Sequence, residues 1–428
     1  MTLAHLTTPL LGLVDTAVVG RMGDAALLGG LAVGAVVFDM VFATFNFLRA
    51  STTGLVAQAF GRGDATEEQA VFWRSLIIAL SCGAALFLLT PVIVLAGLWG
   101  IGPEADVRVA TQTYVTVRMV SAPAGLANYA ILGFLLGRGQ AVSGLLLQSV
   151  INSINIVLSI VFGLYLQWGI AGVAWATVTG ELVGAVAGFA YVYWRFDGRF
   201  RPGWKRVFER PALMRLMSLN RDIMIRSAAL LIAFGLFARQ GAQFGTVTLA
   251  ANAVLMNFLM LASYYLDGFA TAAEQLAGRA LGANNRPAFD RAVRLVLTWG
   301  IALAALTTLI FLIFGASAVD LLTTTKEVRQ EARNYVVWAA FTALAGVLAF
   351  EMDGIFIGAT WSRDMRNMML LSLLLFAVLM VLLVPLLAND GLWIALLVFL
   401  AARGFFLYAL LARRADAAFY GVSAGSIS

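Results

Sequence analysis

Apolar runs long enough to cross a lipid bilayer recur along the whole length of this chain. Of its 428 residues, 61% are hydrophobic and only 12% are charged. Soluble globular proteins carry about 25% charged residues, whereas a membrane-spanning helix needs about 20 mostly apolar ones. The sequence therefore predicts an all-α polytopic membrane protein.

Twelve such runs can be distinguished, separated by polar or turn-forming segments. We expect transmembrane helices at residues 2–22, 28–58, 70–99, 106–136, 141–165, 169–194, 217–242, 247–280, 291–319, 327–358, 366–388 and 391–412. No basic segment precedes the first run, so we expect no cleavable signal peptide.

The segment between the sixth and seventh helices divides the chain. It reads WRFDGRFRPGWKRVFERPALMR and contains two prolines, two glycines and seven Lys or Arg residues. We expect two six-helix lobes, an N-lobe at 1–194 and a C-lobe at 216–428, joined by a cytoplasmic linker at 195–215.

The two halves resemble each other at a fixed offset of 221 residues. The match pairs Gly20 with Gly241, Gly61 with Gly282, Gly133 with Gly354 and Gly137 with Gly358. Because six helices per lobe is an even number, both lobes have the same orientation in the membrane. Such a parallel repeat gives two pseudo-symmetric lobes, an architecture typical of transporters.

Basic residues predict the orientation, because Lys and Arg are enriched in cytoplasmic loops. With a cytoplasmic N-terminus, the inward segments hold 18 of the 29 Lys and Arg residues and the outward segments hold six. We therefore expect both termini in the cytoplasm. The net charge of +6 then reflects orientation in the lipid bilayer, and we expect no nucleic-acid partner.

No enzymatic motif or cofactor site is present in the sequence. It lacks a phosphate-binding loop, HExxH and GxSxG motifs and any His or Cys cluster. The single cysteine, Cys82, excludes an intrachain disulfide. We expect neither an enzyme nor an ATP-driven pump, no cofactor and no metal, so transport must use an ion gradient of H⁺ or Na⁺.

Several ordered stretches carry a resemblance to a known family. They read PLLGLVDTAVVG, FLRASTTGLVAQAFG, SAPAGLANYAILGFLLG, LNRDIMIRS, ANAVLM, YYLDGFATAAE and DGIFIGAT, the last followed by MRN. With these the chain resembles the multidrug and toxic compound extrusion (MATE) family, in its DinF branch. The resemblance implies twelve helices in two lobes, export of small organic, often cationic or amphipathic compounds in exchange for H⁺ or Na⁺, and a monomer in the bacterial inner membrane.

The sequence departs from the MATE pattern in two places. The pattern normally continues upstream of the first match, so we expect the first helix to be incomplete or its start to be misassigned. Related members often have Asn-x-x-x-Asp in the fifth helix, whereas this chain has Asn155 and Ser159. Asp15 is then expected to carry the charge change of the N-lobe alone.

Asp15 interrupts the first apolar run. A carboxylate near the bilayer centre costs about 2.5–3.5 kcal/mol and usually lies in an internal cavity or an ion pair. The nearest basic residue on the same helix, Arg21, is six positions away. Removal from water favours the protonated form of an acid, a property that a proton-coupled carrier needs. We predict that Asp15 is the ion-coupling residue; the alternative is a structural carboxylate bonded to a neighbouring helix.

Polar residues on the fifth and sixth helices are predicted to line the same cavity. Asn152, Asn155 and Ser159 share one helix face because their spacing is i, i+3, i+7. They can hydrogen-bond Asp15 or coordinate a cation, and the alternative is bonding between helices. Thr177 matches the sixth-helix threonine of the MATE pattern.

Four acidic residues of the C-lobe compete with Asp15 for the coupling role: Asp267, Glu274, Glu351 and Asp353. Glu274 approaches the cytoplasmic end of its span. Asp267 and Asp353 lie deeper and are the alternative coupling sites, because some MATE branches couple through C-lobe acids. Glu351 is two residues from Asp353 and therefore points to a different side of the helix.

Arginines within spans need partners. Arg226 follows Asp222 by four residues, which predicts an i,i+4 ion pair. Asp39 is ten residues before Arg49, too far to pair along one helix. We interpret Arg49, Asp222 and Arg226 as structural charges, whereas an unpaired arginine in a cavity would indicate an anionic or zwitterionic substrate.

These features predict a secondary exporter that works by alternating access. One alternative is a lipid-linked precursor flippase of the same superfamily, which favours a larger, arginine-lined cavity and often fourteen spans. A second alternative, from a different class, is a channel or passive membrane receptor. The two-lobe repeat and the basic linker suit moving lobes better than a fixed pore.

Overall fold

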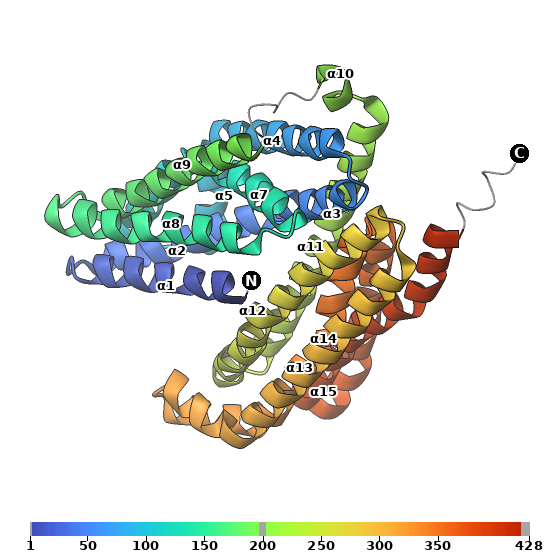
Figure 1. Cartoon of the computed structure of the whole chain (residues 1–428). Helices are drawn as coiled ribbons and strands as arrows, with labels where there is room; N and C mark the ends of the chain where they lie inside the picture. Colours follow the sequence, from blue (N-terminus) through green and yellow to red (C-terminus); the bar gives the residue numbers. More distant parts are fainter. Residues whose placement is uncertain (1, 197–202, 421–428) are drawn as a thin grey trace, which may run out of the picture. The chain divides into compact units, whose positions relative to one another are not determined.

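The computed structural model describes residues 2–196 and 203–420, with side chains described from residue 11 onward. All regular structure in this part is helical (Figure 1). The helices up to the linker are α1 (Thr2–Gly20), α2 (Ala25–Thr44), α3 (Phe47–Gly61), α4 (Ala65–Leu88), α5 (Thr90–Ile101), α6 (Ala105–Met119), α7 (Ala122–Gly137), α8 (Ala141–Ile160) with the π-helical turn η1 (Val161–Tyr165), and α9 (Gly169–Arg195). The remainder are α10 (Trp204–Val207), α11 (Arg210–Gln243), α12 (Thr246–Gly282), α13 (Arg286–Leu322), α14 (Lys326–Gly358) and α15 (Ser362–Tyr420). The prediction of an all-α membrane fold is confirmed.

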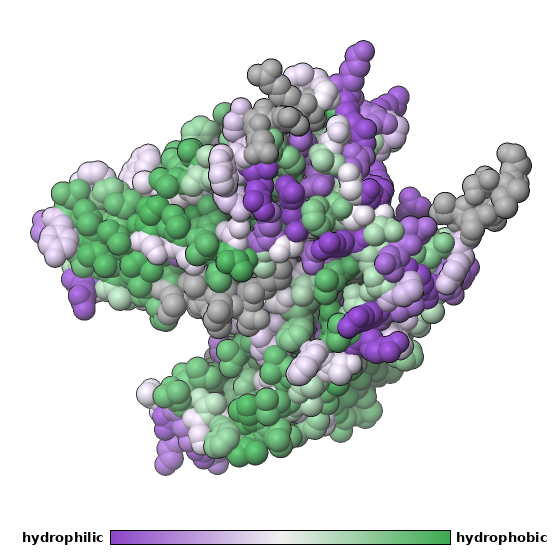
Figure 2. All heavy atoms as spheres, viewed as in Figure 1, coloured by the Kyte–Doolittle hydropathy of each residue, from purple (hydrophilic) through white to green (hydrophobic). Residues whose placement is uncertain are grey.

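Eight helices of the described chain, or nine with one bent pair, are long and apolar enough to cross a membrane. The number is below twelve partly because α15 covers the last two predicted spans, which are separated by a break at Ala388. In α1 the apolar stretch is short, Leu11–Gly20. Figure 2 shows hydrophobic residues over much of the visible surface of both halves and hydrophilic residues gathered around α10.

The predicted continuous helices at 28–58, 70–99 and 106–136 are each broken. One break lies between α6 and α7, which meet at 53°. Pro123 lies in the first turn of α7, and a proline cannot donate the backbone hydrogen bond that would continue the preceding helix. The Ser121 hydroxyl instead donates to the carbonyl oxygen of Arg118 at 2.9 Å.

Close contacts divide the chain into two compact units. One comprises residues 3–60 and 64–216, and the other comprises residues 61–63 and the chain from Met217 onward. We refer to them as the N-lobe and the C-lobe. Residues 197–202 of the predicted linker lie outside the described residues.

The described end of the linker is fixed to the N-lobe. Arg74 of α4 donates from Nε to the carbonyl oxygen of Val207 at 3.0 Å and from Nη2 to that of Arg206 at 2.5 Å. Arg206 in turn pairs with Asp64 at 2.7 Å and with Glu67 at 3.0 Å. These contacts hold the short helix α10 against the N-terminal turn of α4.

The repeat seen in the sequence has a packing basis within each lobe. A Cβ atom added at Gly133 would meet the carbonyl oxygen of Arg49, and one added at Gly354 would meet that of Ala270. The same holds for Gly137 against Thr53 and for Gly358 against Glu274. The contacted residues are also separated by 221 positions. The glycines therefore match because each lobe uses them for the same close approach of two helices.

We expect Gly354→Ala to destabilise the protein by about 1–3 kcal/mol, because the added methyl group must push α14 away from the backbone of α12. Thermal unfolding of the purified protein in detergent measures the effect. Gly235→Ala is the matched control, since nothing lies within 4 Å of a Cβ atom there. Equal stability of the two variants would contradict the packing explanation.

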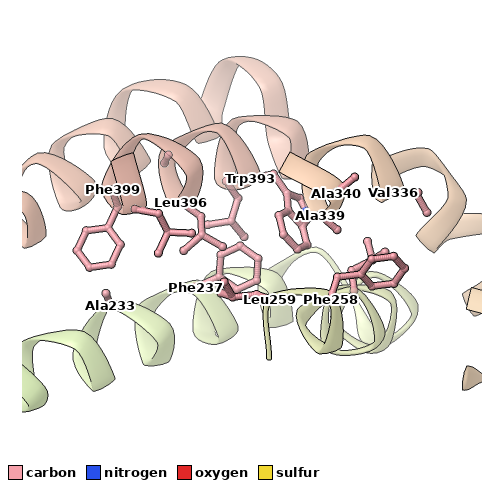
Figure 3. Packing of buried hydrophobic residues seen from close by; sticks show 14 of the residues in the cluster. Ala233, Phe237, Phe258, Leu259, Val336, Ala339, Ala340, Trp393, Leu396 and Phe399 are labelled. Carbon is pink, nitrogen blue, oxygen red and sulfur yellow. The ribbon is translucent and has the colours of Figure 1, made fainter. Parts of the chain in front are cut away.

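The hydrophobic core of the C-lobe includes Trp393, whose ring centroid lies 5.1 Å from that of Phe237 of α11. Phe258 of α12 and Phe399 of α15 belong to the same cluster (Figure 3). The indole Nε1 of Trp393 donates to Oδ1 of Asn252 at 2.9 Å. Asn252 and Asn389 exchange two further hydrogen bonds, of 2.8 and 3.0 Å. These buried bonds anchor the chain directly after the break at Ala388.

Candidate ion-coupling site

The carboxylate of Asp15 is buried in the N-lobe, with 6% of the residue exposed. It accepts a hydrogen bond of 2.8 Å from the hydroxyl of Ser159, on the last turn of α8. The π-helical turn η1 begins two residues after Ser159, and such irregular turns are frequent at functional sites. Ser159, at the position where the resemblance led us to look for an acid, is therefore the direct partner of Asp15.

A chain of polar contacts continues from Ser159 into α9. The Ser159 hydroxyl lies 3.4 Å from Oδ1 of Asn155. Nδ2 of Asn155 donates to the Thr177 hydroxyl at 2.5 Å, and Thr177 donates to the carbonyl oxygen of Val173. Asn155, Ser159 and Thr177 are all buried. Three of the predicted residues thus form one chain of polar contacts that ends at Asp15, to which the Ser159 hydroxyl donates its hydrogen bond.

Asn152 lies one turn from Asn155 and is also buried. Its Oδ1 accepts a hydrogen bond of 3.0 Å from Gln148 on the same helix. Asn152 therefore lies beside the chain of polar contacts. The contacts between Asp15 and Thr177 involve Ser159 and Asn155.

A buried ion pair that the sequence interpretation missed lies in the same lobe. Nη2 of Arg118 is 3.7 Å from a carboxylate oxygen of Glu181 on α9. The guanidinium carbon of Arg118 lies 3.8 Å from the centroid of the Phe38 ring. The charge of Arg118 also acts on Asp15 and on Asp39. The sequence signal for this pair was an Arg inside the fourth apolar run and a Glu inside the sixth.

The described arginines Arg74, Arg118 and Arg138 of the N-lobe form ion pairs with glutamates and not with Asp15. The negative charge of Glu181 offsets the positive charge of Arg118. Asp39, another acid on which the charge of Arg118 acts, lies at an exposed position of α2. Among the described residues, Asp15 is a buried N-lobe acid for which no ion pair within 4 Å occurs. Because an uncompensated buried charge is costly, this arrangement favours uptake of a proton or a small cation at Asp15.

We expect Ser159→Ala to lower ion-driven efflux about tenfold, because a hydrogen bond to a charged group contributes about 1.5–3 kcal/mol. Ser159→Thr keeps the hydroxyl and should retain most activity. The control is Ser153→Ala, which makes the same change at an exposed position of α8. Dye efflux from membrane vesicles is the measurement, and equal rates for both alanine variants would contradict a role for this hydrogen bond.

In the C-lobe, Asp353 is shared by two arginines. Arg226 of α11 contacts its Oδ2, and Arg403 of α15 donates to the same oxygen at 2.9 Å. The predicted pair of Arg226 with Asp222 is wrong. Spacing on one helix made that pair possible, but the tertiary packing of α11, α14 and α15 gives Arg226 a different acid.

Asp222 has its own partners near the start of α15. It lies 2.7 Å from Arg366 and 3.2 Å from Arg221, and it accepts a hydrogen bond from Ser362. With Asp353 held by two cations, the structure gives neither acid the uncompensated environment of Asp15.

The other predicted charges have local contacts. Arg49 donates to Oδ1 of Asn46 at 3.2 Å, at the break between α2 and α3. Asp267 interacts electrostatically with Arg403, and its carbonyl oxygen accepts from Thr271. In the described ranges, 2–196 and 203–420, no group of His, Cys, Asp and Glu side chains is arranged to hold a metal ion.

Comparison with known proteins identifies the family. A model of the MatE family matches residues 1–161 and 223–383. The chain belongs to this family. It is 38% identical over 417 residues to the DNA damage-inducible protein F of Escherichia coli (strain K12), a match that covers 96% of this chain and 89% of that protein. The resemblance to MATE transporters and to their DinF branch is confirmed.

More distant MATE relatives agree with this assignment. The chain is 25% identical to the probable multidrug resistance protein NorM of Rhizobium meliloti, over 82% of this chain and 76% of that protein. A crystal structure of MATE in the bent conformation has the same fold, with a TM-score of 0.89, 18% identity and coverage of 99% of this chain and 95% of that chain. The chain is therefore a multi-pass membrane transporter and not an enzyme.

Proposed function

We propose that this MATE family member is a secondary exporter of small organic compounds, cationic or amphipathic, driven by an inward gradient of H⁺ or Na⁺. It acts as a monomer in the bacterial inner membrane, with both termini in the cytoplasm, and requires no bound cofactor. Several of its relatives carry the names multidrug resistance protein or multidrug and toxin extrusion protein, which supports this substrate class.

The observation that carries the proposal is the buried carboxylate of Asp15, which accepts a hydrogen bond from Ser159 and has no ion-pair partner among the described side chains. Such a group changes charge when it binds a proton or Na⁺. Its neutralisation weakens attraction for a cationic substrate in the same lobe, which is then released outside. The ion shifts the transport equilibrium only through its different affinity for the outward-open and inward-open states.

The decisive experiment measures efflux of a fluorescent organic cation, ethidium, in everted membrane vesicles. A proton gradient and a Na⁺ gradient are imposed separately, each with and without a dissipating ionophore. We expect one gradient to drive accumulation of ethidium and its ionophore to abolish it. Ethidium movement at the same rate with and without either gradient would contradict the proposal and favour a channel. Movement of lipid-linked precursors without ethidium transport would favour the flippase.

A further inference from the structure

A second buried acid, Glu351 on α14 of the C-lobe, has an environment unlike that of any site described above. The residue is 0% exposed. Within the described part of the chain, neither of its carboxyl oxygens has a hydrogen-bond partner. Buried carboxylates are normally paired or hydrogen-bonded, so this group requires an explanation.

The fold provides space for this carboxyl group. A Cβ atom added at Gly300 of α13 would clash with Oε1 of Glu351, and its next neighbour would be Val347. The carboxyl group thus occupies the volume that any larger residue at position 300 would fill. In the N-lobe the position 221 residues earlier is Ala130, which is also buried. The acid is therefore an addition to one lobe and not part of the repeated packing.

Among the residues that the structure describes, no Lys or Arg side chain forms an ion pair with Glu351. Its helix packs against α12, α13 and α15. Away from the ends of these helices, the ionisable residues are Tyr264, Tyr265, Asp267 and Glu274 on α12, Tyr335 and Asp353 on α14, and Asp390, Arg403 and Tyr408 on α15. Arg279 lies near the end of α12, and α13 carries no charged residue between Arg294 and Asp320. Arg403 is bound to Asp353.

We propose that Glu351 is a second proton-binding site of the transport cycle, which holds a proton in the conformation described and releases it when water reaches the contact between α13 and α14. An ionised carboxylate without a partner is very costly to bury, so the neutral acid is the form that this packing accepts. Release breaks the O–H bond of the carboxyl group and transfers the proton to water, leaving a carboxylate. This inference rests on the proposed function, since it adds a proton to the same cycle.

Infrared spectroscopy of the purified protein tests the first half of this inference. The C=O stretching band of protonated carboxylic acids is recorded near neutral pH for wild type, Glu351→Gln and Glu327→Gln. The last is a matched control, because Glu327 is an exposed acid on the same helix. We expect Glu351→Gln to lose part of the band and the control to keep it. An unchanged band in Glu351→Gln would overturn the inference.

Proton release tests the second half. Ethidium is added to weakly buffered protein, and a pH-indicator dye reports the protons released per bound ethidium. We expect Glu351→Gln to release about half as many as wild type, because one of two titrating groups is gone. Loss of the infrared band with unchanged proton release would show a permanently neutral acid and would also overturn the inference.

Two further variants make the outcome decisive. If Glu351→Gln does not fold, Gly300→Ala displaces the carboxyl group from its space and should shift the infrared band; an unshifted band counts against the inference. Asp15→Asn separates this inference from the proposed function. If Asp15→Asn keeps ion-driven efflux, the proposed role of Asp15 fails. The infrared band of Glu351 and the protons that Glu351 releases can still be measured in that variant.

Discussion

Replacement of Asp15 by Asn is expected to reduce gradient-driven efflux strongly while leaving the protein folded. Asn keeps the shape of the side chain and can still accept the hydrogen bond from Ser159. It can neither take up a proton nor change charge. We expect ethidium efflux to fall roughly 100-fold, the lower range seen when a proton-transferring side chain is removed.

Everted vesicles with an imposed proton or Na⁺ gradient provide the measurement, and thermal unfolding in detergent verifies folding. The control is Asp106→Asn, the same substitution at an exposed N-lobe acid. Asp15→Glu is informative as well, because it retains an ionisable group and should retain partial activity. Full coupled efflux by Asp15→Asn would exclude Asp15 as the coupling residue.

Replacement of Asp353 by Ala is expected to cause the largest loss of stability. Arg226 and Arg403 would both lose the carboxylate that they share. Breaking a buried ion pair by removing one partner costs about 3–5 kcal/mol, because the remaining charge is left buried and unpaired. We therefore expect a lower free energy of unfolding, measured in detergent, and a lower yield of folded protein.

The control is Asp320→Ala, which removes an acid from an exposed pair with Arg333. Such surface pairs contribute about 0–1 kcal/mol, so its stability should be near wild type. Adding Arg226→Met and Arg403→Met to Asp353→Ala should recover most of the lost free energy of unfolding, because none of the three buried charges then remains. A stable Asp353→Ala variant that transports ethidium without ion coupling would instead make Asp353 a coupling site.

The residues of the candidate site differ in how far the sequence could predict them. Asp15 was detectable because a carboxylate in an apolar run is costly wherever the helix packs. The shared face of Asn155 and Ser159 follows from helix periodicity. The pair of Arg118 with Glu181 was not predictable, because it joins two helices whose residues lie far apart in the chain. Arg226 illustrates the same limit, since its partner Asp353 is 127 positions away.

The sequence by itself determined the membrane environment, the two-fold repeat and the positions of charged residues inside apolar runs, whose burial costs free energy. Those properties follow from local composition and from a spacing of 221 residues between glycines that pack in the same way. Tertiary structure alone decided which charges neutralise one another. Arg118 and Arg226 pair with carboxylates from other helices, whereas Asp15 and Glu351 have no basic ion-pair partner among the described residues. The physical reason is that pairing of buried charges depends on helix packing, and the hydrophobic pattern that forms the helices carries no information about it.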